Sequence, residues 1–260
     1  MQRDDKVIVN HHLFEGSHVH LIVTAKDSDA CKMFYGQIEK QITDSIKRLL
    51  GLEHLSLWTK VTAYEIPTLI DAINEIVYLY TNPSNDDLTA KIEDYPGVSS
   101  WDKATRATSL NDCMSSWHPW IQLPMIESLP CRSVTDRQDR LITERMRSKA
   151  IEKHELKIYP NQWIGLFIKN PTAENVNSIN KRIVSLIRRK EAANAIRRQK
   201  SGKQVLGAKR LKAQILLKPH TPKKKGRKIF VKSIFREIRI KLISDMKHIS
   251  ALCKHAYERW

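Results

Sequence analysis

The chain has 260 residues with 45 lysines and arginines against 28 aspartates and glutamates, so its formal net charge is +17. Its four cysteines are scattered without a C-x-x-C spacing, which excludes a zinc ribbon or disulfide framework and favours a reducing cytoplasm. The sequence has neither a signal-peptide pattern nor an apolar run long enough to span a bilayer, so we expect a soluble, cytoplasmic protein without a membrane partner.

The positive charge is concentrated in the second half of the chain. Residues 1–130 contain 11 basic and 18 acidic side chains, whereas residues 131–260 contain 34 basic and 10 acidic ones. This asymmetry indicates a globular first half joined to a second half that contacts a polyanion. The alternative is a solvated, helix-rich surface that happens to be basic, and an excess of this size makes it the less favoured interpretation.

A strand predicted over residues 18–24 carries two histidines on one face. Val19, Leu21 and Val23 alternate with His18, His20 and Ile22, so the two sets point to opposite sides of a sheet. Two imidazoles that leave the same face can share one divalent metal ion. An H-x-H pattern alone is weak, because each histidine can equally be an ordinary surface residue of a strand.

The other elements of the first half alternate between strand and helix. A short strand is expected just before His11 and His12, which are adjacent and which we interpret as ordinary polar residues on opposite faces. An amphipathic helix is predicted from about residue 30, capped by the Asp-Ser-Asp that precedes it and ended by Gly51. Residues 55–63 are rich in β-branched and aromatic side chains and are predicted as a further strand.

A second helix, predicted to begin after Thr68, separates two tyrosines. At 100° per residue Tyr80 falls within the apolar stripe, which also contains Leu69, Ile70, Ile73, Ile76 and Val77. Tyr78 and Asn82 fall on the polar face with Asp71 and Glu75, one turn apart. Pro83 disfavours helical backbone at the residue before it, so the helix is expected to end at Asn82.

The rest of the chain is interpreted as a linker over residues 102–133 and a basic, mostly α-helical extension over residues 134–260. The extension is expected to contain a charged helix over residues 137–154, a long helix from Thr172 to about Arg198 and a final amphipathic helix over residues 231–257. The candidate nucleic-acid contacts lie on the long helix and in a basic linker before the last helix; they are Lys181, Arg182, Arg188, Arg189, Lys190, Lys223, Lys224, Lys225, Arg227 and Lys228.

Taken together, two segments resemble the HUH single-tyrosine transposases, in particular the REP-associated (IS200-like) tyrosine transposases. The matching residues are His18-Val19-His20 and the run Ile76-Val-Tyr78-Leu-Tyr80-Thr-Asn82-Pro83. Residues 93–101 are similar to the family's acidic, aromatic and proline segment ahead of paired serines. The resemblance covers residues 7–101. The family usually has asparagine where this chain has Ser17. It also usually has more chain before the histidines, including a first strand and a helix, so the domain is expected to be N-terminally truncated, which would leave its sheet incomplete.

The resemblance implies an α/β (α+β) fold in which helices pack on an antiparallel sheet, the ferredoxin-like HUH nuclease core, over residues 1–101. It implies an endonuclease and strand transferase acting on single-stranded or hairpin DNA. Tyr78 would be the nucleophile, leaving a 5′-phosphotyrosine, and His18, His20 and Asn82 would hold Mg²⁺ or Mn²⁺. A phenol with a pKa near 10 is a poor nucleophile, so a cation that polarises the phosphate suits this chemistry.

Two other functions stay open at this point. One is a nucleic-acid-binding protein descended from such an enzyme and catalytically inactive; the short N-terminal region favours it, and the intact motif residues oppose it. The other is a replication initiator or relaxase of the wider HUH group, which the transposase-like tyrosine helix disfavours. Relatives in this family often act as homodimers, and a DNA partner would place the protein at the nucleoid.

Salt dependence tests the predicted polyanion contact. If the basic half contacts phosphates, binding releases condensed counterions, and because their release gains less free energy at higher salt, raising the salt concentration weakens the affinity for DNA steeply. Fluorescence anisotropy of a labelled hairpin at increasing salt measures the slope of log K against log [salt]. A flat response would contradict the assignment.

Overall fold

The computed structural model describes residues 7–16, 18–58, 62–121, 151–213 and 233–258. Its strands form two antiparallel pairs, β1 (Val7–Phe14) with β2 (Val19–Ala25), and β3 (Met114–Ile121) with β4 (Ile151–Ile158). The helices are α1 (Ser28–Leu50), α2 (Leu69–Asn85), α3 (Trp101–Arg106), α5 (Ala173–Ser201), α6 (Ala208–Lys212) and α7 (Arg236–Glu258), with short 3-10 turns η1 (Ile92–Asp94) and η3 (Gln162–Leu166). The expectation of a mixed α/β fold with antiparallel strands is therefore confirmed. None of the helices described has both the length and the apolar character needed to cross a membrane.

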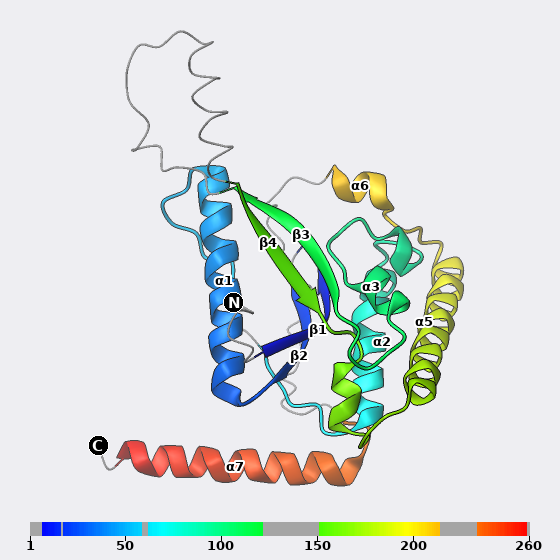
Figure 1. Cartoon of the computed structure of the whole chain (residues 1–260). Helices are drawn as coiled ribbons and strands as arrows, with labels where there is room; N and C mark the ends of the chain where they lie inside the picture. Colours follow the sequence, from blue (N-terminus) through cyan, green and yellow to red (C-terminus); the bar gives the residue numbers. More distant parts are fainter. Residues whose placement is uncertain (1–6, 17, 59–61, 122–150, 214–232, 259–260) are drawn as a thin grey trace, which may run out of the picture.

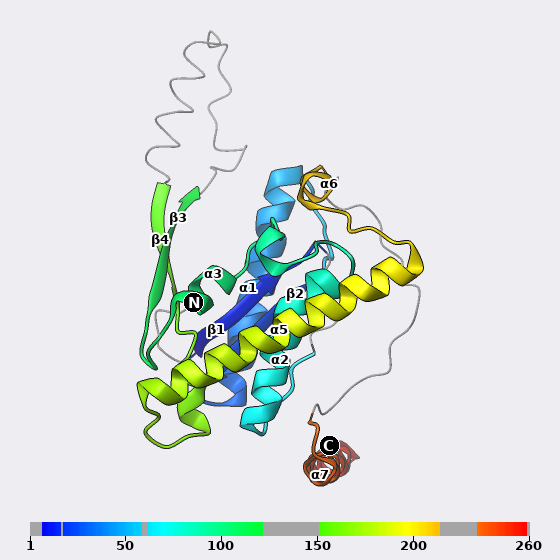
Figure 2. The ribbon, with the colours of Figure 1, turned by 90° about the vertical axis from the view of Figure 1, so that its right-hand side faces the viewer.

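The β1–β2 hairpin is covered by helices on both faces. α1 lies on one side, α2 lies on the other, and α5 packs along the outer side of α2 (Figures 1 and 2). The larger core joins α2 to α5 and contains, among others, Ile73, Ile76, Tyr80, Val176, Ile183 and Ile187. α5 therefore shares one core with the predicted catalytic domain, although the sequence placed it in an extension beginning at residue 134.

β2 alternates between the two helical layers as predicted. Leu21 and Val23 pack with the smaller cluster under α1, whereas Ile22 packs against the larger core beside α2. The strand itself begins at Val19, so His18 is the last residue of the turn that joins β1 to β2. Both histidines nevertheless reach the α2 side of the hairpin.

Because of a β-bulge at Asn10, side chains from the two halves of β1 contact different helical layers. Val9 pairs with Val23, but the next pair is His11 with Ile22, so Asn10 is the extra residue. Side chains alternate with period two, and one inserted residue therefore reverses the facing of everything after it. The Asn10 side chain accepts a hydrogen bond from Thr24 (2.9 Å) and donates one to the carbonyl of Tyr159 (2.8 Å), which fixes the bulge.

His11 and His12 are core residues, because both faces of the hairpin are covered, and their interpretation as ordinary polar residues is wrong. Both are buried, with 4% and 3% exposure. His11 Nδ1 lies 2.8 Å from the Tyr80 hydroxyl, which lies 2.8 Å from Ser100 Oγ. Ser100 Oγ in turn accepts a hydrogen bond from the backbone N–H of His12. This chain of bonds ties β1 to α2 and to the start of α3.

The outer edge of β1 is paired with segments from elsewhere in the chain. Leu13 forms a bridge with Ser99, and the backbone N–H of Phe14 donates to the carbonyl of Val98. Near the other end of the strand, the N–H of Tyr159 donates to the carbonyl of Val9. Residues 93–101, which are similar to the family's acidic, aromatic and proline segment, therefore contribute to this edge of the hairpin. They pair with backbone groups that would otherwise lack hydrogen-bond partners in the sheet.

α1 has the predicted ends, but the strand predicted after it is wrong. The Asp27 side chain accepts from the N–H of Ala30, and Gly51 ends the helix in a left-handed conformation with φ 64°. The described part of residues 55–63 is irregular. The Trp58 indole donates to the Glu39 carbonyl and to Thr43 Oγ1 of α1, so this segment lies along the helix instead of pairing with a strand.

α2 is capped by Thr68 as predicted, but it does not end at Asn82. The helix runs through Pro83 to Asn85, and the N–H of Asp86 still bonds to the carbonyl of Asn82. Proline removes one backbone donor and disfavours helix before it, yet the packing of α5 on the last turn holds the helical path. This extra turn brings Asp86 to the candidate site.

The segment predicted as a linker over residues 102–133 contains α3 and β3 in its described part. Of the charged helix predicted over residues 137–154, only residues 151–154 are described, and they belong to β4. α5 begins at the predicted cap Thr172 and ends before Gly202, and α7 takes up most of the predicted final helix. Several large apolar residues of α7, including Ile243 and Ile249, are exposed.

The burial of His11 predicts a pH dependence of stability. Burial, with a smaller contribution from His12, lowers the His11 pKa from 6.5 to about 3, so the folded protein keeps this imidazole neutral while the unfolded chain protonates it below pH 6.5. Stability is therefore lost as the pH falls below 6.5. Between pH 7.5 and 5.5 we expect a loss of about 1.4 kcal/mol in the free energy of unfolding from this group.

Urea unfolding at the two pH values, compared with His11→Gln, measures this contribution. Glutamine keeps a polar group for Tyr80 but does not titrate, so its stability should fall less over the same range. An identical pH dependence in the two proteins would contradict the assignment.

Candidate functional site

Two histidines and one asparagine converge from the hairpin and from α2. The Asn82 side-chain amide lies 3.0 Å from His18 Nε2 and 2.9 Å from His20 Nε2. The two imidazole rings lie edge to face, with centroids 4.7 Å apart. Asn82 was expected on a polar helix face, but it is 4% exposed because the histidines cover it. Three residues singled out from the sequence thus form one cluster.

Tyr78 lies beside this cluster and is accessible. Its ring is perpendicular to that of His20, with centroids 5.7 Å apart, and it is 38% exposed. Tyr80, two residues later, is 1% exposed and belongs to the core, and its burial raises the pKa of its hydroxyl. The helical spacing therefore separates the two tyrosines as predicted: Tyr78 is at the cluster, and Tyr80 anchors the helix.

Glu15 is a fourth member of the cluster that sequence reasoning missed. It lies in the turn between β1 and β2, where its N–H donates to the carbonyl of His18. Its Oε2 lies 3.2 Å from His18 Nε2, its side chain is 2% exposed, and Oε1 has no hydrogen-bond partner among the described residues. Burial, with Asp86 as a second cause, raises its pKa to about 7. The feature of the sequence that could have identified Glu15 is a carboxylate three residues before the H-x-H pair.

Asp86 approaches the same cluster from the end of α2. One ligand-type atom from each of Glu15, His18 and Asp86 lies within 4.8 Å of the others. Burial lowers the pKa of His18, whereas the negative charge of Asp86 acts in the opposite direction. The imidazole is thereby favoured in its neutral form, which is the form that ligates a metal.

The spacing of these groups fits a small divalent cation. Octahedral Mg²⁺ holds its ligands at about 2.0–2.1 Å, which places neighbouring ligand atoms about 3 Å apart. The Asn82 amide nitrogen lies 2.9–3.0 Å from the two histidine Nε2 atoms, and His18 Nε2 lies 3.2 Å from Glu15. An amide binds a cation through its oxygen, so Asn82 becomes a ligand when its amide is turned over to place Oδ1 at this position. The buried, unpartnered oxygen of Glu15 is the kind of atom that a cation would satisfy. The donor set of imidazole, amide and carboxylate suits Mg²⁺ or Mn²⁺.

α5 fixes the end of α2 that carries Asn82 and Asp86. The Arg198 guanidinium donates to the carbonyl of Ser84 (3.0 Å), and Arg197 donates to the carbonyl of Asn85 (2.9 Å). Cations at the C-terminal end of a helix satisfy its free carbonyls and complement its dipole. α5 is therefore part of the scaffold of the site.

The predicted nucleic-acid contacts divide into three groups. Lys181, Arg182, Arg189 and Lys190 are exposed on α5. Arg188 instead pairs with Glu93 and Glu191 and lies over the Trp101 ring at 5.7 Å, so it holds α5 to the segment around α3. Its role as a DNA contact stays a prediction. The remaining residues, Lys223, Lys224, Lys225, Arg227 and Lys228, lie outside the described residues.

Comparison with protein-family models, curated proteins and solved structures finds no match to this chain. The geometry of the cluster and the residue motifs therefore carry the functional argument.

Proposed function

We propose that the protein is a metal-assisted, single-stranded DNA endonuclease and strand transferase of the HUH single-tyrosine type. The observation that carries the proposal is that His18, His20 and Asn82 meet within hydrogen-bond distance, with Tyr78 against His20, although hairpin and helix are about sixty residues apart in sequence. In this proposal β1, β2, α1 and α2 represent the ferredoxin-like HUH core, of which the described residues contain one hairpin.

Tyr78 has the exposure that a nucleophile needs. Its phenol oxygen attacks a backbone phosphorus, a phosphorus–oxygen bond forms, and the bond to the 3′ oxygen breaks. The proton lost by the phenol is balanced by the one taken up by the leaving 3′ oxygen. The products are a 5′-phosphotyrosine and a free 3′-OH, and because the phosphoester is retained, rejoining needs no nucleotide cofactor.

His18, His20, Asn82 and Glu15 would hold the divalent ion. When bound, Mg²⁺ or Mn²⁺ would stabilise the negative charge that develops on the phosphate. The buried carboxylate contributes an anionic ligand to a set that is otherwise neutral. The exposed cations of α5, Lys181, Arg182, Arg189 and Lys190, would contact phosphates along the strand and position it.

Covalent capture of labelled DNA tests the nucleophile. With a hairpin oligonucleotide and Mn²⁺, the fragment that keeps the 5′-phosphate becomes attached to the protein, so a 3′-end label should shift on a denaturing gel and a 5′-end label should not. Tyr78→Phe should abolish the adduct. Tyr35→Phe, on α1 across the sheet, is the matched control and should leave the yield unchanged.

The outcomes separate the enzyme from its alternatives. An adduct that persists in Tyr78→Phe would assign the nucleophile to another residue. Binding of the hairpin by wild type without any adduct would instead support a catalytically inactive nucleic-acid-binding protein.

Metal affinity tests the ligand set independently of activity. At pH 8, above the raised pKa of Glu15, electron paramagnetic resonance titration should detect one Mn²⁺ site. We expect His20→Ala to weaken it by at least about tenfold and Glu15→Gln to weaken it by roughly tenfold, because each removes a ligand. Glu65→Gln, at an exposed position, is the control. Equal affinities in all four proteins would contradict the assignment.

A further inference from the structure

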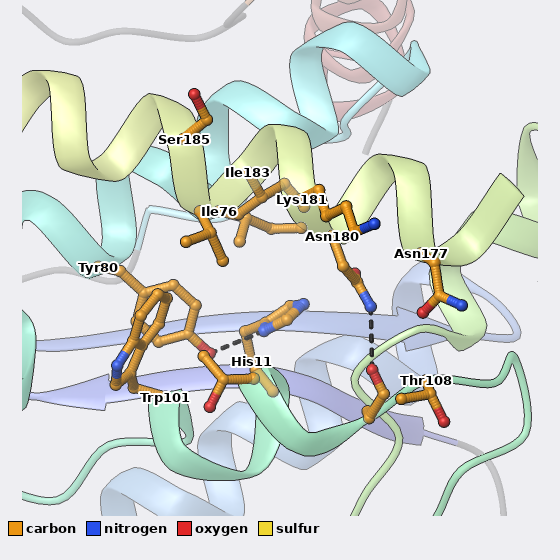
Figure 3. Close-up of a pocket in the computed structure, with 14 residues that line it drawn as sticks. His11, Ile76, Tyr80, Trp101, Thr108, Asn177, Asn180, Lys181, Ile183 and Ser185 are labelled. Atoms are coloured by element: carbon orange, nitrogen blue, oxygen red, sulfur yellow. Dashed lines mark hydrogen bonds between the residues drawn. The ribbon is translucent and has the colours of Figure 1, made fainter. Parts of the chain in front are cut away.

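A cavity lies between α2, α3 and α5, above β1. Its volume is about 380 Å³, within the range of sites that hold small organic groups. His11 and Tyr80 line its floor, Ala104 lines it from α3, and Ile183 and Lys181 line it from α5 (Figure 3). The cavity is a separate site, because its lining contains none of the residues of the metal-type cluster, which are Glu15, His18, His20, Asn82 and Asp86.

The floor of the cavity presents an unsatisfied nitrogen. His11 is buried, and its Nε2 has no hydrogen-bond partner of normal geometry among the described residues, although the Pro160 carbonyl lies close enough to the ring to oppose the lowering of its pKa. Figure 3 shows Nδ1 directed at the Tyr80 hydroxyl and the other ring nitrogen pointing away from it, towards the α5 side. A buried polar atom of this kind is costly unless something bonds to it.

The surrounding hydrogen bonds give His11 Nε2 two possible roles. The Ser100 hydroxyl lies 2.8 Å from the Tyr80 hydroxyl and 3.2 Å from the carbonyl of His12, and either member of the Tyr80–Ser100 pair can donate. When Ser100 donates to His12, Tyr80 donates to Ser100 and its oxygen accepts from His11 Nδ1–H, which leaves a lone pair on Nε2. In this arrangement the cavity offers an acceptor to a ligand with an N–H or O–H group; in the reverse arrangement Nε2–H offers a donor. The edge of a nucleobase carries groups of both kinds.

The walls and rim define the rest of the ligand. Ile76, Ala104, Ile183 and Val184 make the walls largely apolar, which suits a flat, unsaturated ring. Asn180 donates to the carbonyl of Ala107 and holds α5 against the end of α3, fixing one wall. Lys181 lines the cavity and is exposed, and Arg182 follows it on α5, so an anion attached to the ring would meet positive charge.

We propose that this cavity receives one unpaired nucleobase of a bound DNA strand. A nucleobase combines an apolar face, an edge with N–H donors and an attached phosphate, which matches the walls, His11 Nε2 and Lys181 in turn. The inference rests on the proposed DNA substrate, but it does not depend on cleavage. The cavity lies on the far side of α2 from Tyr78. A base held there would help to select and position the bound strand, while cleavage would take place at the metal-type cluster.

Oligonucleotides with and without bases test the proposal. Anisotropy is measured with fluorescein-labelled 15-mers of dA, dC and dT and with an abasic 15-mer that has the same number of phosphates. For wild type we expect at least one base-bearing strand to bind about tenfold more tightly than the abasic strand, a difference typical of one held base. Ala104→Phe fills the cavity and should bring that ratio close to one, without changing affinity for the abasic strand.

Two further variants make the result specific. His11→Phe keeps a planar aromatic ring, although a larger one, and removes the ring nitrogens, so it should lower the same ratio in a protein whose melting temperature shows that it is folded. Ala193→Phe, at an exposed position of α5, makes the same size change outside the cavity and should behave as wild type. The inference is overturned if Ala104→Phe retains the wild-type ratio, or if Ala193→Phe loses it equally.

The result is distinguishable from the fate of the proposed function. Loss of the base-dependent ratio in Ala104→Phe without any covalent adduct in wild type would leave a base-binding protein without nuclease activity. Adduct formation with an unchanged ratio in Ala104→Phe would leave the nuclease and remove the base site.

Discussion

The bulge at Asn10 is the constraint on which the arrangement of this molecule depends. Before it, Val7 and Val9 face α1; after it, His11 and Leu13 face α2. Without the extra residue, the period of two would direct His11 towards α1 and separate it from Tyr80. The hydrogen bonds of Asn10 to Thr24 and Tyr159 thus decide which helix each half of β1 contacts, and through Tyr80 they fix the rotation of α2 that places Tyr78 and Asn82 beside the hairpin.

The basic residues of α5 have two different roles, which the total charge does not separate. Arg188, Arg197 and Arg198 are engaged with carboxylates and helix-end carbonyls, and they hold the segment around Glu93 and the last turn of α2 in place. Lys181, Arg182, Arg189 and Lys190 are exposed, and Lys181 also lines the cavity. Part of the excess charge is therefore used in folding, and the remainder is accessible to solvent. The two sets do not form separate stripes: at 100° per residue Arg188 falls within about 20° of Lys181 and about 180° from Arg197.

Predictions from the sequence were correct for features that depend on local periodicity, and they were wrong for features that depend on packing between distant segments. Alternation in β2 placed His18 and His20 on one side, and the helical angle separated Tyr78 from Tyr80; both agree with the structure. The contact of His11 with Tyr80 follows from an insertion visible only in the strand pairing. The segment around Trp58 has strand-like composition, but its indole bonds to α1. Pro83 lies within α2 because α5 packs on the following turn, and Glu15 joins the cluster through the geometry of a tight turn.

The cluster also joins two parts of the chain that are far apart in the sequence. Glu15, His18 and His20 belong to one short hairpin, whereas Asn82 is 62 residues beyond His20. A ligand bound by both parts bridges the ends of a loop of that length. In the native state the fold already holds these ends together, whereas in the unfolded chain bringing them together would cost conformational entropy. Whatever binds there would act as a reversible crosslink, stabilising the fold in proportion to the logarithm of its concentration above its dissociation constant. The stability of the whole domain would then report occupancy of the site.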